Sequence, residues 1–249
     1  GTAWSSLATT NLTARTMTVG GGNQSAAILA GGDTNSGGNW GTSPSSVCQT
    51  WTPSSFTTVN SLNVATWGAG GGTPSTAIVC CGTYSAIDTN QTYNGDTWTT
   101  EAESYPSGSR DQAADGNAQD AFFVGGYDGS YTADTYSWNG VSWTGGSPNP
   151  DGAVSVQEGS ACGQLANFSF FSVSTATGTA NFYDGTTWTL SPADTNYGRR
   201  SACGGDNSYF FKANTDDNSG NTEYFNGSTF TTSGSMATAV RSGGNGANI

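Results

Sequence analysis

Aromatic and acidic side chains recur together in several segments that separate the predicted strands of this chain. Aromatic rings cover the apolar C–H faces of sugars, and nearby carboxylates and amides bind their hydroxyls. The same residue types dominate protein interfaces, so these segments could also bind a protein. A further interpretation is that they are ordinary solvated turns. We therefore expect a ligand-binding surface built from Trp40, Tyr84, Tyr127, Asp128, Tyr131 and Asp134.

Acid–base and metal chemistry have little support in the sequence. The chain contains no histidine, which is the commonest general base and the usual imidazole ligand of metals. The segment from Asn214 to Gly220 is rich in oxygen ligands, but its spacing differs from that of an EF-hand loop. We expect no catalytic residue, no metal and no cofactor.

A short aromatic phrase repeats along the chain and defines its organisation. Four copies contain Asn94-Gly95, Asn139-Gly140, Asp184-Gly185 or Asn226-Gly227 between aromatic residues. Including weaker copies, the last aromatic falls at positions 4, 56, 98, 143, 188 and 230, a period of about 45 residues that is typical of propellers and solenoids. Each Asn-Gly or Asp-Gly pair predicts a tight hairpin in which both turn residues have positive φ.

A second pair of strand-like runs precedes each of these hairpins. Arg110 to Ala114 leads through Asp115-Gly116-Asn117 to an apolar run, Ala121 to Val124, which ends at Gly125-Gly126. Two hairpins make four strands, which is one propeller blade. We expect a single domain over residues 1–249, with complete repeats at about 4–56, 56–98, 98–143, 143–188 and 188–230.

An apolar run closed by Gly-Gly, followed by Tyr127-Asp128-Gly129 and Trp143, resembles the kelch repeat of β-propellers. The pattern departs from kelch at Cys81-Gly82, Ser172-Val173 and Lys212-Ala213. The resemblance implies a recurring arginine, matched here by Arg15, Arg110, Arg199 or Arg200, and Arg241. Because these arginines recur at one phase, we expect their guanidinium groups to satisfy backbone carbonyls between blades. The copper-radical oxidases with kelch-like propellers need histidine ligands, so their reaction is excluded.

The two ends of the chain predict how the ring closes. Five complete repeats lie between a fragment at Trp4 and a fragment from Ala239 to Gly244. Pairing both ends in one blade would remove exposed strand edges. We expect an all-β, kelch-like β-propeller of six four-stranded antiparallel blades, with five or seven blades as alternatives.

The net charge and the lengths of the apolar runs disfavour some classes of partner. Acidic residues outnumber basic ones 18 to 6, and the net charge of −12 disfavours nucleic acid and anionic membranes. No apolar run reaches the roughly 20 residues needed for membrane insertion.

Cys162 and Cys203 lie in matching Ser-Ala-Cys-Gly phrases, so we expect them at like positions on neighbouring blades. Buried free thiols are the expectation, and a disulfide or metal site is the alternative.

Three function classes follow, and we expect the contacts of the first to lie on the face that carries the longer connections. The first is a non-enzymatic extracellular or virion-surface propeller that binds a glycan or a protein surface and forms a homo-oligomer or larger assembly. The second is an intracellular protein-binding kelch propeller. The third is a carbohydrate-active enzyme. Asp184-Gly185-Thr186-Thr187-Trp188 is similar to the aspartate box of sialidases, although its Asp and Gly are one residue too close. Sialidases also need arginines for the substrate carboxylate and a tyrosine nucleophile, for which Arg199-Arg200 and Tyr197 are the candidates. We expect the first.

Overall fold

The structure is a computed structural model, and it describes residues 15, 18–34, 42–82, 88–107, 110–153, 160–163, 168–171, 180–191, 202–213 and 220–236. Within these ranges the chain forms 20 strands and no helix. The strands make five four-stranded sheets, each antiparallel and each paired in chain order. The prediction of an all-β fold with four-stranded antiparallel sheets is therefore confirmed.

Each sheet is one blade, numbered here in chain order. Blade 1 contains β1 (Val19–Asn23), β2 (Ala26–Ala30), β3 (Cys48–Thr52) and β4 (Ser55–Val59). Blade 2 contains β5 (Ala69–Thr73), β6 (Thr76–Cys80), β7 (Asn90–Tyr93) and β8 (Trp98–Thr100). Blade 3 contains β9 (Ala113–Gly116), β10 (Ala121–Val124), β11 (Thr135–Trp138) and β12 (Trp143–Gly145). Blade 4 contains β13 (Ser160–Cys162), β14 (Phe168–Phe171), β15 (Ala180–Tyr183) and β16 (Trp188–Leu190). Blade 5 contains β17 (Ala202–Gly205), β18 (Phe210–Ala213), β19 (Thr222–Phe225) and β20 (Phe230–Thr232).

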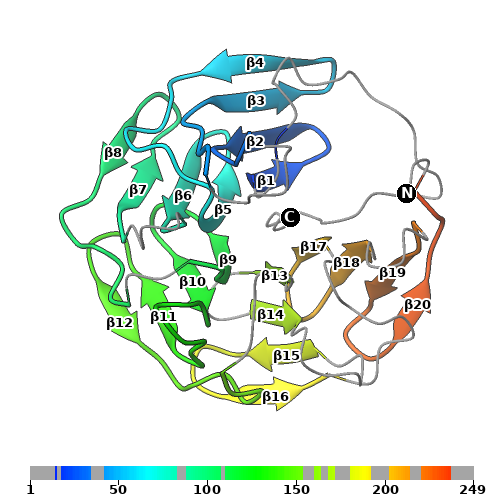
Figure 1. Cartoon of the computed structure of the whole chain (residues 1–249). Coiled ribbons are helices and arrows are strands. Elements are labelled where there is room, and N and C mark those ends of the chain that lie inside the picture. Colours follow the sequence, from blue (N-terminus) through cyan, green and yellow to red (C-terminus); the bar gives the residue numbers. More distant parts are fainter. Residues whose placement is uncertain are drawn as a thin grey trace.

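The blades are arranged radially around a common centre (Figure 1). The first strand of each blade lies innermost and the fourth lies at the rim, and β1, β5, β9, β13 and β17 contact one another in that order. This arrangement is a β-propeller. The predicted sixth blade draws on residues 1–14 and 237–249, which lie outside the described residues, so six blades remain a prediction.

Glycine-rich inner strands allow the blades to meet closely at the centre. A β-carbon at Gly21 in β1 would overlap the backbone carbonyl of Gly72 in β5. A β-carbon at Gly71 would overlap the carboxyl group of Asp115 in β9. Only a residue without a side chain fits at these two positions, which explains why β1 and β5 contain runs of glycine where strands normally favour β-branched residues.

One aromatic pair closes the outer hairpin of each blade, as the repeated phrase predicts. The two rings of each pair lie 4.9–5.2 Å apart, in the pairs Trp51–Phe56, Tyr93–Trp98, Trp138–Trp143, Tyr183–Trp188 and Phe225–Phe230. Trp98, Trp143 and Trp188 occupy equivalent positions, and each packs against the preceding blade. Their predicted placement between adjacent blades is confirmed.

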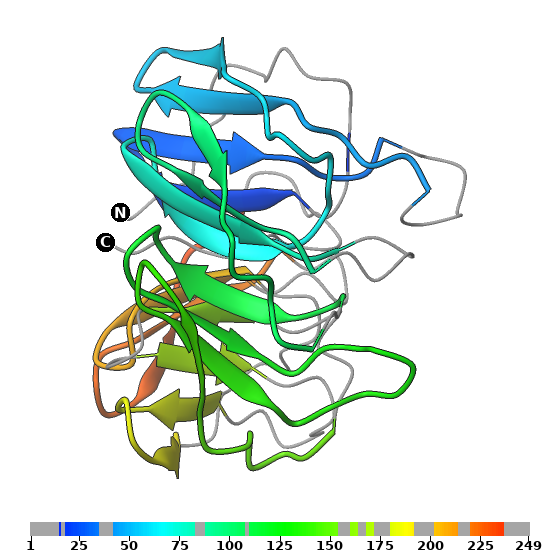
Figure 2. The ribbon, with the colours of Figure 1, turned by 90° about the vertical axis from the view of Figure 1, so that its left-hand side faces the viewer.

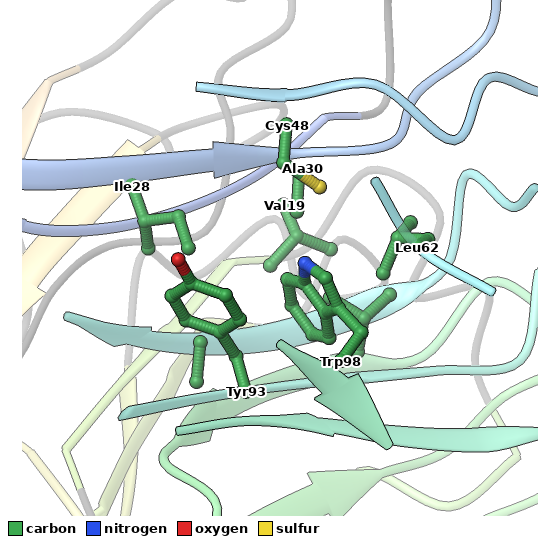
Figure 3. Close-up of a cluster of buried hydrophobic side chains, with 9 residues drawn as sticks. Val19, Ile28, Ala30, Cys48, Leu62, Tyr93 and Trp98 are labelled. Atoms are coloured by element: carbon green, nitrogen blue, oxygen red, sulfur yellow. The ribbon is translucent and has the colours of Figure 1, made fainter. Parts of the chain in front are cut away.

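The boundary between blades 1 and 2 shows how this packing works (Figure 3). Trp98 and Tyr93 of blade 2 lie beside Val19, Ile28 and Cys48 of blade 1, and the Trp98 side chain is only 5% exposed. Burying a large aromatic ring in a neighbouring blade stabilises both sheets together. The aromatic repeat therefore holds blades together as well as marking their period.

The outer hairpin turns differ from the expected two-residue turns. Four residues separate β7 from β8, and among the described residues no asparagine has a positive φ. Gly95 alone takes φ +98°, while the Asn94 side-chain carbonyl accepts the backbone N–H groups of Asp96 (3.0 Å) and Thr97 (2.9 Å). The asparagine thus caps the turn with its side chain instead of entering the left-handed region. The expectation of positive φ at both turn residues is wrong.

The expected equivalence of Cys162 and Cys203 is also wrong, by one residue. Phe168 in β14 and Phe210 in β18 occupy corresponding positions. Cys162 pairs with the residue that follows Phe168, whereas the residue that follows Phe210 pairs with Gly204. Cys162 therefore corresponds to Gly204, the residue after Cys203. A shift of one residue moves a side chain to the opposite face of a strand. As a result the two cysteines meet in one buried cluster at the boundary of blades 4 and 5. All five cysteines are buried, as expected.

Buried polar side chains in the third strands anchor the connections that lead to the face described below. Gln91 in β7 donates to the Val64 carbonyl at 3.0 Å and accepts the Val64 N–H at 2.9 Å. The Asn181 amide in β15 donates to a carboxylate oxygen of Asp151 at 2.7 Å. Because a buried amide needs partners, these bonds fix the paths of the connections between blades.

Candidate binding surface on the long-loop face

The two ends of the strands carry connections of very different length. The β1–β2 and β3–β4 hairpins turn at residues 24–25 and 53–54, at one end of blade 1. The β2–β3 connection and the connection to blade 2 leave from the other end. Figure 2 shows the short turns on its left-hand side and the longer connections projecting on its right-hand side. We call the second side the long-loop face.

Four of the six predicted site residues lie together on this face. Tyr127, Asp128, Tyr131 and Asp134 all belong to the β10–β11 connection of blade 3, residues 125–134. The connection folds back on itself, because the Gly125 N–H donates to the Asp134 carbonyl at 2.8 Å. Trp40 and Tyr84 fall outside the described residues, so their placement stays a prediction.

Arg110 enters this surface from the segment that precedes β9. Arg110 and Tyr127 exchange two backbone hydrogen bonds, of 3.2 and 2.8 Å. The guanidinium carbon of Arg110 lies 4.7 Å from the centre of the Tyr127 ring, and the Tyr131 ring meets the Tyr127 ring edge to face at 5.1 Å. Tyr131 is 40% exposed. A row of one cation and two rings thus ends at an accessible tyrosine.

Two of the arginines predicted to share one structural role, Arg15 and Arg110, lie in the described part of the chain. Arg15 donates to the carbonyls of Gly31 (2.8 Å) and Val47 (3.3 Å), which both belong to its own blade. These bonds confirm that Arg15 satisfies backbone carbonyls, and its placement between blades stays a prediction. Arg110 stacks on Tyr127 and pairs with Asp111. The remaining three candidates, Arg199, Arg200 and Arg241, lie outside the described residues.

Asp111 is a member of this surface that sequence reasoning did not identify. Its side chain is 5% exposed, and its Oδ1 atom has no hydrogen-bond partner among the described residues. Its backbone has φ +65°, and its Oδ2 atom lies 3.6 Å from Nε of Arg110. Burial raises the pKa of the Asp111 carboxyl to about 6, against the opposing effect of Arg110. A strained, buried acid with a displaced pKa is typical of functional sites.

The other two carboxylates of the surface are exposed and lie near a third tyrosine. Burial raises the pKa of Tyr136 in β11, and the negative charges of Asp134 and Asp128 raise it further. Tyr136 also contacts the buried Tyr105 ring at 5.2 Å. The carboxylates of Asp128 and Asp134 therefore make this part of the surface acidic and rich in hydrogen-bond acceptors.

We refer to Arg110, Asp111, Tyr127, Asp128, Tyr131 and Asp134 as the third-blade surface. Tyr131 is an exposed aromatic residue, the two exposed carboxylates can accept hydrogen bonds, and Asp111 has a buried carboxyl oxygen without a hydrogen-bond partner among the described residues. Within the described ranges, no group of three acidic or cysteine side chains has the arrangement needed for a metal. The described part of the chain contains no helix long and apolar enough to span a membrane.

Comparisons with known proteins support the fold. No protein-family model matches the chain, and no curated protein matches it in sequence. A solved structure entitled "Structure of YjhT" is similar, with a TM-score of 0.65 over 93% of this chain and 86% of that one. The two sequences are 10% identical. This similarity shows a shared β-propeller fold.

Proposed function

We propose that this protein is a non-enzymatic β-propeller that binds a carbohydrate through the third-blade surface. The observation that carries the proposal is the exposed Tyr131 ring, held edge to face by Tyr127 and flanked by carboxyl groups. A fixed ring stacks on the C–H face of a sugar without first losing rotational freedom, and carboxyl oxygens accept hydrogen bonds from its hydroxyls.

The polarity of this surface favours a sugar over an apolar protein partner. Asp128 is exposed beside Tyr127, and Asp134 is exposed three residues after Tyr131. Charged residues are depleted at the centre of protein interfaces, whereas sugar sites combine rings with carboxylates. The surface of a neighbouring subunit remains the second partner that this chemistry suits.

We also propose that the blades are of the kelch type. Support comes from the Gly31-Gly32 and Gly125-Gly126 pairs, which occupy equivalent positions after β2 and β10, and from the aromatic pair in each outer hairpin. Arg15 supports the same proposal by binding two backbone carbonyls.

The proposed setting is an extracellular assembly or a virion appendage. A single lysine and a net charge of −12, together with many Gly, Ser, Thr and Asn residues, favour this setting. We expect a homo-oligomer or larger assembly. Size measurement and electron microscopy of unfractionated material test this expectation, and a uniformly monomeric protein would contradict it.

A carbohydrate-active enzyme is the second candidate, because one observation favours it. A carboxyl group with a pKa of about 6, like that of Asp111, is suited to act as a general acid. The sialidase-like phrase gives it no support, because Asp184 caps a hairpin by accepting the N–H groups of Thr186 and Thr187. Arg199, Arg200 and Tyr197 lie outside the described residues.

A panel of neutral and acidic oligosaccharides, with matching aryl glycosides, separates the two candidates. Binding and hydrolysis are measured on the same purified protein, one pH unit below and one above the pKa of Asp111. We expect saturable binding of at least one oligosaccharide and no hydrolysis. Hydrolysis that is lost in Asp111→Asn would establish the enzyme, and absence of any binding would refute the proposed function.

A further inference from the structure

Cys80 and Cys81 are adjacent residues at the end of β6, and their sulphur atoms lie 2.9 Å apart. Both side chains are fully buried. Even carbon atoms, which are smaller than sulphur, pack best at about 3.5–4.0 Å when they are not bonded. The two thiols are therefore closer than an ordinary packing contact.

The backbone at Cys81 supplies a second, independent observation. Cys81 has φ +66°, the same conformation as Gly31 (+65°) in blade 1 and Gly125 (+66°) in blade 3, which follow β2 and β10. Blades 1 and 3 thus use glycine at this position, where glycine has no steric penalty. A cysteine in the left-handed region is strained, and such strain persists where the side chain has a function.

We propose that Cys80 and Cys81 are a redox modification site and that they oxidise to a disulfide between adjacent residues. The bond would close a small ring at the point where the chain leaves β6 for the long-loop face. This inference is independent of the proposed carbohydrate binding. It also explains why Cys81-Gly82 departs from the diglycine pattern, because Cys81 would form a covalent bond that a glycine at its position cannot form.

The oxidant required is a small disulfide such as oxidised glutathione. The thiolate of one cysteine attacks this disulfide, forms a mixed disulfide and releases one glutathione thiolate. The thiolate of the other cysteine then attacks the protein-bound sulphur of the mixed disulfide and releases the second glutathione thiolate. The two cysteine protons end on the two released thiols, and the two electrons lost by the protein reduce the oxidant.

Burial places this reaction early in folding. Cys80 and Cys81 share a buried cluster with Tyr105 and Phe123, which covers them once blades 2 and 3 have packed. Burial raises the pKa of the Cys80 thiol well above its usual range, so little thiolate exists in the folded protein. The pair therefore oxidises before the blades pack, and the folded protein then protects whichever redox state was formed.

Cys162 and Cys203 are the competing pair in the described part of the chain. They meet across the boundary of blades 4 and 5, in the same buried cluster. Both residues have negative φ, since Cys81 and Asp111 are the non-glycine residues with positive φ in the described ranges. Their backbone therefore shows no strain that a disulfide would explain.

Thiol counting on refolded protein tests the inference. The chain is unfolded, reduced, refolded with a mixture of reduced and oxidised glutathione, and then alkylated under denaturing conditions without reductant. Of the five cysteines, we expect three to be alkylated. The peptide that contains residues 80 and 81 should carry no label and be lighter by two hydrogen atoms than its reduced form. Prior treatment with dithiothreitol should restore full labelling.

Three variants serve as controls. Cys81→Gly restores the residue that blades 1 and 3 use at this backbone conformation, and Cys80→Ala removes the partner without changing residue 81. In each of these two variants all four remaining cysteines should be alkylated, whereas Cys162→Ala should leave the Cys80–Cys81 bond intact. Labelling of all five cysteines in the refolded wild-type chain would overturn the inference. A bond between Cys162 and Cys203 in place of the Cys80–Cys81 bond would overturn it as well.

Discussion

The Asp115 carboxyl group in β9 accepts the backbone N–H of Gly163, at the end of β13, at 2.9 Å. Its other oxygen accepts the N–H of Gly116 at 2.8 Å. Asp115 is fully buried, and burial raises its pKa well above the usual range while the two N–H groups act in the opposite direction. A single side chain thus joins the inner strands of blades 3 and 4, directly against Gly71 of blade 2.

Replacing Asp115 by Ala should destabilise the propeller strongly. Two buried N–H groups lose their acceptor, and each unsatisfied donor costs about 1–3 kcal/mol. Denaturant unfolding measures the loss. Asp128→Ala is the control, because that side chain is exposed and its removal should change stability by no more than about 0.5 kcal/mol. Equal effects of the two substitutions would contradict the role given to Asp115.

Replacing Trp98 by Ala should lower the unfolding free energy by removing packing between blades 1 and 2. The ring is buried against Val19 and Cys48, and truncation of a buried aromatic side chain costs about 3–5 kcal/mol. Trp143 is partly buried, so Trp143→Ala should cost less. Thermal and denaturant unfolding of both variants check the order. A smaller loss for Trp98→Ala than for Trp143→Ala would refute the packing described.

The buried pair of Lys212 and Glu223 offers a test of electrostatics in the core. Lys212 Nζ lies 3.9 Å from Glu223 Oε2, and both side chains are buried at facing positions of β18 and β19. Lys212→Met leaves a buried carboxylate without this partner and should destabilise by about 3–5 kcal/mol. Lys212→Met combined with Glu223→Gln should cost less than the sum of the single substitutions. Additive losses in this double-mutant cycle would show that the two charges are not coupled.

Asp111 predicts a specific pH dependence of stability. Its pKa of about 6 in the folded protein exceeds the value of about 3.9 for an unfolded aspartate. An acid with a raised pKa stabilises the folded state below the unfolded pKa, and this contribution is lost as the pH rises through the folded pKa. The loss between pH 4 and 7 should be about 2 kcal/mol for this group.

Comparison of the wild-type chain with Asp111→Asn isolates this effect. The neutral amide cannot ionise, so the difference in unfolding free energy between the two proteins should change with pH across that window. Asp128→Asn, at an exposed position, should follow the wild-type pH profile. A constant difference between the wild-type chain and Asp111→Asn at every pH would show that Asp111 ionises normally.

The sequence predicts those features that are set locally and repeated. The aromatic pairs and the Gly positions of the outer hairpins follow from turn chemistry and period alone, and the structure places them as expected. Asp111 could not be found in this way, because its burial arises only in the folded chain and no repeated phrase marks it. Its only signal in the sequence is that it follows Arg110.

Register is the second feature that the sequence could not provide. The matching phrases around Cys162 and Cys203 suggest equal positions, but pairing with β14 and β18 shifts them by one residue. The aromatic residues Phe168 and Phe210 keep equivalent positions in these strands and pack between blades. Long-range packing therefore overrides a short local similarity.

The most direct test of the proposed function compares two exposed tyrosines on opposite faces. Tyr131 lies on the long-loop face, whereas Tyr209 is 53% exposed beside the short β17–β18 hairpin turn. The oligosaccharide that binds best in the panel is titrated calorimetrically into the wild-type chain, Tyr131→Ala and Tyr209→Ala. Loss of the Tyr131 ring should weaken binding by about tenfold, because a stacked ring contributes about 1 kcal/mol or more. Tyr209→Ala should bind as the wild-type chain does. Unchanged affinity in Tyr131→Ala, or a comparable loss in Tyr209→Ala, would contradict binding through the third-blade surface.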